Sequence, residues 1–194
     1  MIFKQLFDTV SSTYTYLLAC EATGQAILID PVLPEWERDL AEINKRGLKL
    51  AYTVETHIHA DHVSGARKLA NAYGAELCLF ESAQVTYPFR PLHDGEELPL
   101  GQLRLRIVHT PGHRPELMSL LIVNPERSSE PSMVLTGDSL LVGDVGLCYL
   151  MIGATGAEDK IDWLVDVLRP YGIVEMGRTG RVAMARGKSG NGHK

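Results

Sequence analysis

Three histidines and an aspartate stand within six residues of this chain, and their spacing is suited to binding metal. The stretch 57–62 reads His-Ile-His-Ala-Asp-His. Closely spaced histidines repel one another once protonated and are costly to bury, so a metal is the simplest reason for them. His57 and His59 stand two residues apart, so in an extended segment both rings leave the same face and can bind one ion. Asp61 and His62 can face a neighbouring ion or support the first.

Two further polar turns follow apolar, strand-like runs later in the chain. One reads His-Thr-Pro-Gly-His and ends at His113, and the other reads Thr-Gly-Asp-Ser and contains Asp138. The Pro-Gly pair predicts a tight turn that directs the ring of His113 into a cleft. His109, at the end of the preceding strand, is interpreted as a structural or supporting histidine rather than a ligand. Three such pieces in this order indicate a metal site built from separate loops.

These three pieces resemble the ligand motifs of the metallo-β-lactamase superfamily. The resemblance implies an α/β fold, the αββα four-layer sandwich of the metallo-β-lactamase type, with ligands at strand ends. The metal residues that it implies are His57, His59, Asp61, His62, His113 and Asp138. It also implies a late histidine for a second metal position, but after Asp138 the one histidine is His193, near the end of the chain. Glu175 or a water would then complete the second position, or that position binds weakly or not at all.

One branch of the superfamily, the persulfide dioxygenases, resembles most of the stretch 53–146. Its members hold a single Fe(II) by two histidines and one carboxylate, which leaves positions open for oxygen and a sulfur substrate. Carried over to this sequence, the iron ligands would be His57, His113 and Asp138. His59 and the predicted catalytic pair, Asp61 and His62, would then orient ligands and water. The implied reaction oxidises glutathione persulfide to sulfite with one Fe(II) per chain.

Two positions depart from the persulfide dioxygenase pattern and leave other functions open. Arg114 follows His113 where a small hydroxyl residue is usual, and Leu147-Cys148-Tyr149 stands where Arg-Pro-Asp is expected. The alternative enzyme is a hydrolase of thioesters or lactones, similar to glyoxalase II, with one or two Zn(II) and a metal-activated hydroxide. A further alternative is a degenerate member that binds only a metal and a thiol.

Composition and charge narrow the class of protein. The chain has 194 residues, of which 45% are hydrophobic and 22% charged, so we expect one domain over 1–186 and a disordered tail over 187–194. A net charge of −5 argues against a nucleic-acid surface. Three isolated cysteines favour a reducing, cytoplasmic setting, and no apolar run suits a membrane span or signal peptide. The expected partner is a small-molecule thiol or thioester, with a homodimer left open.

Apolar spacing and turn residues predict an alternation of strands and helices around these motifs. Helices are expected over 34–46, 64–73 and 157–168. Strands are expected over 2–7, 13–20, 26–29, 48–54, 75–80, 103–108, 117–123, 133–135 and 173–176. The stretch 81–100 is expected to be a loop with one short strand near Leu98.

Overall fold

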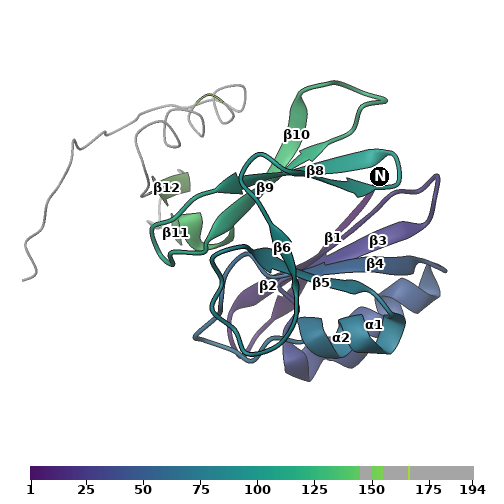
Figure 1. The fold of residues 1–194 in the computed structure, drawn as a ribbon, viewed down its shortest axis with the longest axis horizontal. Helices are drawn as coiled ribbons and strands as arrows, with labels where there is room; N and C mark the ends of the chain where they lie inside the picture. The colour runs from purple at the N-terminus through teal and green to yellow at the C-terminus, as the bar shows by residue number, and fades with distance from the viewer. Residues whose placement is uncertain (145–149, 155–165, 167–194) are drawn as a thin grey trace, which may run out of the picture.

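Two β-sheets lie face to face in the protein, which is described by a computed structural model covering residues 1–144, 150–154 and 166 (Figure 1). The first sheet contains β1 (Ile2–Asp8), β2 (Thr13–Ala19), β3 (Gln25–Ile29), β4 (Lys49–Val54), β5 (Glu76–Phe80) and β6 (Arg90–Leu92) in that order. The second contains β10 (Pro131–Leu135), β9 (Met118–Val123), β8 (Leu103–His109) and β7 (Glu97–Leu100). A separate hairpin pairs β11 (Leu140–Asp144) with β12 (Leu150–Ala154).

The main core lies between the two sheets. Ile27 and Ile29 of β3 face this layer from one side, and Leu105 and Ile107 of β8 from the other, all fully buried. The alternation of side chains along each strand produces this arrangement, because every second residue points to the same face of a sheet. On the opposite face of β8, the side chains of Arg104 and Arg106 are 57% and 43% exposed.

Two helices cover the other face of the first sheet. They are α1 (Trp36–Lys45), which follows the short 3₁₀ turn η1 (Leu33–Glu35), and α2 (Ala66–Tyr73). Ile43 of α1 and Leu69 of α2 are fully buried against Leu17 and Leu28 of the sheet. Because both faces of this sheet are covered, the residues of β3 after Gln25 are all apolar. The described residues thus contain one helical layer and two sheets of the expected sandwich.

Most of the predicted elements are present, with ends shifted by one or two residues. Three strands were missed. The stretch 81–100 contains β6 as well as the expected short strand, and β6 pairs with β5 in parallel through Cys78 and Arg90. The hairpin of β11 and β12 was not predicted either. Short strands of this kind depend on a partner strand more than on a local pattern. The helix predicted over 157–168, the strand over 173–176 and the tail over 187–194 lie outside the described residues.

The predicted metal-binding segments meet where strands of the two sheets end. The metal loop, which we define as residues 55–65, joins β4 to α2, while His113 lies between β8 and β9 and Asp138 lies in the 3₁₀ turn η2 (Gly137–Ser139) after β10. A hydrogen bond of 3.0 Å from Met118 N to Thr56 O joins the start of β9 to the metal loop. This contact brings ligand-bearing loops of the two sheets together.

Gly137 allows the turn after β10 to approach the metal loop closely. Its φ is +48°, and a Cβ atom built on it would lie 2.7 Å from Thr56 Oγ1. Any larger residue would therefore push η2, and Asp138 with it, away from the metal loop. Among the described residues, no helix is long and apolar enough to cross a membrane.

Candidate metal centre

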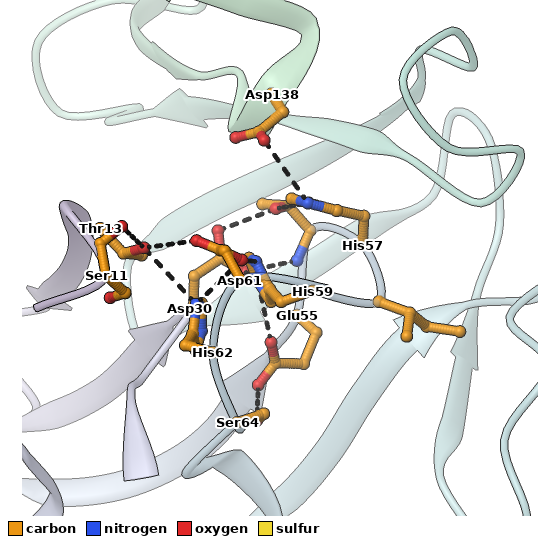
Figure 2. A network of polar contacts seen from close by, with 12 residues as sticks. Ser11, Thr13, Asp30, Glu55, His57, His59, Asp61, His62, Ser64 and Asp138 are labelled. Carbon is orange, nitrogen blue, oxygen red and sulfur yellow. Dashed lines mark hydrogen bonds and ion pairs between the residues drawn. The ribbon is translucent and has the colours of Figure 1, made fainter. Parts of the chain in front are cut away.

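His57, His113 and Asp138 form one group of metal-ligating side chains. One ligand atom from each lies within 4.8 Å of the other two. His57 Nε2 is 3.8 Å from Asp138 Oδ2 (Figure 2). His113 Nε2 is 3.5 Å from the same oxygen. The His57 side chain is only 2% exposed, whereas those of His113 and Asp138 are 47% and 44% exposed. The group is thus anchored in the protein on one side and open to a small molecule on the other.

Thr56 and Asp30 fix the ring of His57. The Thr56 hydroxyl donates to Asp30 Oδ2 at 2.8 Å and lies 3.0 Å from His57 Nδ1. A hydroxyl has a single hydrogen, so Thr56 accepts a hydrogen bond from the Nδ1–H of His57. Burial, together with the positive charge on His59, lowers the pKa of His57 and favours the neutral ring. The lone pair of its Nε2 is therefore directed at Asp138, as metal ligation requires.

His59 is held by two buried carboxylates. Its Nε2 lies 3.1 Å from Asp30 Oδ1 and 3.1 Å from Glu55 Oε2. Burial alone would lower the pKa of His59, but the attraction of Asp30 and Glu55 outweighs it and raises the pKa to about 11. The same surroundings act differently on Glu55, because burial and repulsion by Asp30 raise its pKa to about 7. Ligation of a metal through Nδ1 of His59 would require the loss of its second proton.

Asp61 and His62 form a second group with His59. Ligand atoms of the three side chains lie within 4.8 Å of one another. His62 Nδ1 is 3.2 Å from Asp61 Oδ1, and the Thr13 hydroxyl donates to Asp61 Oδ2 at 3.1 Å (Figure 2). His62 Nε2 is buried and has no hydrogen-bond partner among the described residues. A buried imidazole nitrogen without a partner, on a ring whose other nitrogen contacts a carboxylate, is suited to a cation or to a bound water.

The structure thus brings all six predicted residues together, but in two groups. The rings of His57 and His59 lie next to each other, with centroids 4.1 Å apart, and those of His59 and His62 are 4.3 Å apart. His59 was predicted next to His57 on one ion or as a support for an iron site. Its ligand atoms group with Asp61 and His62 on one side, and with Asp30 and Glu55 on the other. The hydrogen bond of His59 to Asp30 and its ion pair with Glu55 account for this separation.

Sequence reasoning missed the buried acids around the site. Asp30 accepts hydrogen bonds from both the backbone N–H and the hydroxyl of Thr56, at 2.7 and 2.8 Å. Although burial opposes ionisation, the charge of His59 and the Thr56 hydrogen bonds lower the pKa of Asp30. Glu116 accepts a hydrogen bond of 3.1 Å from Ile58 N. Two of these acids could have been found from the sequence, because Asp30 and Glu55 directly follow strand-like runs, in Ile-Leu-Ile-Asp and Tyr-Thr-Val-Glu. A charge at the end of a buried strand needs a partner.

Two further histidines, His93 and His109, lie outside these groups in the described part of the chain. His109 Nε2 lies 2.8 Å from the carbonyl oxygen of Pro115, and its ring stacks on Phe80 with centroids 4.1 Å apart. This confirms its interpretation as a structural histidine. The side chain of His93 is 55% exposed, and its Nδ1 lies 3.0 Å from Glu81 Oε2.

The chain is similar in sequence and structure to known persulfide dioxygenases and metallo-β-lactamases. The mitochondrial persulfide dioxygenase ETHE1 of Bos taurus is 34% identical over 149 residues, which are 75% of this chain and 55% of that protein. The crystal structure of ETHE1 from Myxococcus xanthus matches with 39% identity and a TM-score of 0.66, covering 73% of this chain and 59% of that one. A metallo-β-lactamase from Staphylococcus aureus matches with 32% identity and a TM-score of 0.69, covering 75% and 45%. The chain has the metallo-β-lactamase fold.

The match confirms the predicted resemblance to the superfamily and to its persulfide dioxygenase branch, as well as the α/β metallo-β-lactamase class of fold. The chain spans little more than half the length of the persulfide dioxygenases it matches. A different family model, described as the small subunit of acetolactate synthase, matches residues 141–187. Most of that stretch lies outside the described residues, so the single domain over 1–186 stays a prediction. A cytoplasmic location also stays one, and the Bos taurus relative is named as mitochondrial.

Proposed function

We propose that this metallo-β-lactamase-fold chain is a mononuclear iron persulfide dioxygenase that oxidises glutathione persulfide to sulfite. The ligands of Fe(II) are His57, His113 and Asp138. The observation that carries the proposal is the grouping of two imidazoles and one carboxylate within 4.8 Å, while Asp30 and Glu55 hold His59 apart from them. The similarity to the persulfide dioxygenases of Bos taurus and Myxococcus xanthus supports it.

The donor set suits the proposed metal. Two histidines and one carboxylate are the usual ligands of non-haem Fe(II) in oxygenases, and they leave further positions open. When bound there, Fe(II) would provide one binding site for both the substrate sulfur and O₂, and it would provide the electron transfer that is missing when sulfur and O₂ react directly. Overall, one persulfide, one O₂ and one water give one thiol, one sulfite and two protons. The oxidised atom is the outer sulfur, and O₂ is the species reduced.

The side chains of the protein have separate tasks in this proposal. Thr56 keeps His57 in the tautomer that presents Nε2 to the metal. The exposed sides of His113 and Asp138 leave a path for the substrate. Asp61, paired with His62 at 3.2 Å, provides a carboxylate and an imidazole next to the site that can hold a proton or orient a water.

Metal analysis and oxygen uptake test the proposal. Protein prepared without a chelator should contain about one iron per chain, consume O₂ with glutathione persulfide and release sulfite in equal amount. His113→Ala should lose both the iron and the oxygen uptake. His93→Ala, which alters an exposed histidine paired with Glu81, is the matched control and should keep both. Iron-loaded protein that turns over a thioester but takes up no O₂ would overturn the proposal.

A two-zinc hydrolase of thioesters or lactones is the second candidate. It is favoured by the group of His59, Asp61 and His62 and by the buried, unpartnered Nε2 of His62. The His62→Ala variant distinguishes the two candidate functions. A two-zinc hydrolase should lose about one zinc per chain and nearly all activity, whereas a one-iron dioxygenase should keep its iron and part of its oxygen uptake.

A further inference from the structure

Arg114 is tied to the metal loop through one buried carboxylate. It directly follows His113, and its Nε donates to Glu116 Oε1 at 3.2 Å. The same oxygen accepts the backbone N–H of Ile58 at 3.1 Å, and Ile58 stands between His57 and His59. The guanidinium is therefore two hydrogen bonds away from the backbone that carries the metal residues.

The pairing fixes the guanidinium and leaves its outer edge available. The Glu116 side chain is only 6% exposed, whereas that of Arg114 is 42% exposed. A buried carboxylate with two donors has little freedom to move, so it orients the planar fork attached to it. The contact uses Nε, and in the described part of the chain Glu116 is the one carboxylate found paired with this guanidinium. Nη1 and Nη2 can then bind a second, external carboxylate.

The negative charge around the candidate metal centre makes the cation of Arg114 significant for substrate binding. The groups around the metal include four further carboxylates, on Asp30, Glu55, Asp61 and Asp138. The chain as a whole carries a net charge of −5. Within the three segments that carry the metal residues, 55–65, 109–117 and 136–139, Arg114 is the only arginine or lysine. A bound Fe(II) and the protonated His59 offset part of this negative charge, and Arg114 is the arginine or lysine in these segments that can attract an anionic substrate further.

We propose that Arg114 determines substrate specificity by binding a carboxylate of the sulfur substrate through Nη1 and Nη2. The substrate class is accordingly that of persulfides carrying a carboxylate, as glutathione persulfide does, and persulfides that lack a carboxylate are poor substrates. Glu116 is the residue that positions Arg114. The effect of Arg114 on turnover rests on the proposed dioxygenase function, whereas its effect on binding can be tested alone.

Binding of glutathione and of glutathione diethyl ester to the metal-loaded protein tests the inference without turnover. The ester keeps the thiol and lacks both carboxylates. By calorimetry the unaltered protein should bind glutathione about tenfold more tightly than the ester, and Arg114→Gln should remove this preference without weakening ester binding. Arg114→Lys should retain part of it, because it keeps the charge but not the fork. Metal content, measured in parallel, should match the unaltered protein in every variant.

Two further variants make the test specific. Arg106→Gln is the matched control, since the Arg106 side chain is 43% exposed and pairs with one carboxylate, Glu97, at 3.1 Å on the second sheet. It should leave both affinities unchanged. Glu116→Gln keeps an oxygen for Ile58 N–H but loses the ion pair, and it should weaken glutathione binding by about threefold with ester binding intact. The inference is overturned if Arg114→Gln binds glutathione normally, or if it loses glutathione and ester equally.

Steady-state kinetics distinguish failure of this inference from failure of the proposed function. Arg114→Gln should raise KM for glutathione persulfide about tenfold and leave kcat within about twofold. Normal KM in an active Arg114→Gln enzyme contradicts the role of Arg114 and leaves the dioxygenase function standing. No oxygen uptake by the unaltered, iron-loaded protein contradicts the dioxygenase function, and the calorimetric preference for glutathione then still decides whether Arg114 binds a carboxylate.

Discussion

His59 Nε2 lies 3.1 Å from Asp30 Oδ1, and this contact decides which nitrogen of His59 faces the metal site. Asp30 also accepts the hydroxyl of Thr56, which in turn accepts from His57. A single buried carboxylate therefore orients two rings of the metal loop, one directly and one through a hydroxyl. Such supporting residues influence metal affinity although they touch no metal.

Substitution of Asp30 should weaken metal binding more than it weakens the fold. In Asp30→Asn the amide presents only one acceptor oxygen, so the Thr56 hydroxyl bond to Oδ2 cannot be kept together with the contacts that Thr56 N–H and His59 make to Oδ1. Metal affinity, measured by competition with a chromophoric chelator, should fall about tenfold to a hundredfold. Thr56→Val removes only the hydroxyl that orients His57, so it should lower the metal affinity less than Asp30→Asn does. An unchanged chelator midpoint in Asp30→Asn would contradict this role.

The hydroxyl of Thr13 should matter for the rate through Asp61. Thr13→Val removes the 3.1 Å hydrogen bond to Asp61 Oδ2 while keeping the shape of the side chain. If Asp61 acts in turnover, the loss of its orientation should lower kcat by about tenfold with little change in KM. Thr13→Ser keeps the hydroxyl and should recover most of the rate. Equal rates in the valine and serine variants would show that the hydrogen bond has no part in turnover.

Replacement of Gly137 should displace Asp138. In Gly137→Ala the new Cβ would meet Thr56 Oγ1 at 2.7 Å, and the left-handed backbone adds strain. We expect a loss of about 2 to 4 kcal/mol in the free energy of unfolding, measured with urea, together with weaker metal binding. Gly47→Ala is the control, because Gly47 has φ +61° but nothing within 4 Å of a Cβ. It should lose only about 1 to 2 kcal/mol and keep its metal.

Asp39 should give the stability of the protein a measurable pH dependence. Its side chain is fully buried, and burial, opposed by Arg38, raises its pKa from 3.8 to about 6. The folded state binds this proton more tightly than the unfolded state, so the stabilising contribution is complete below the unfolded pKa and is lost as the pH rises through about 6.

The expected size of this pH effect follows from the same shift. Between about pH 5 and about pH 7.5 the free energy of unfolding should fall by about 1 to 1.5 kcal/mol more in the unaltered protein than in Asp39→Asn. Urea titrations at the two pH values measure this difference. Glu37→Gln, an exposed acid on the same helix, should follow the unaltered protein. Parallel pH profiles for the unaltered protein and Asp39→Asn would refute the assignment.

Local sequence was sufficient to predict candidate metal-binding residues, because the ability to bind metal depends on residue type and short spacing. The metal loop, the Pro-Gly-His turn and the Thr-Gly-Asp turn were each recognisable alone, and the structure brings their side chains together. The interpretation of His109 as structural also holds, since its ring stacks on Phe80. Strand β6 was missed because its pairing with β5 depends on a partner outside its own sequence.

The division of the ligands into two groups was decided only by the tertiary structure. Sequence spacing places His57 and His59 on the same face, whereas Asp30 and Glu55, at the ends of β3 and β4, turn Nε2 of His59 away from Asp138. Likewise, the position of Arg114 beside the metal loop depends on Glu116 reaching Ile58 across the chain. The sequence alone determined which side chains can bind metal. Their orientations depend on buried hydrogen bonds between residues far apart in the chain, and folding alone brings those residues into contact.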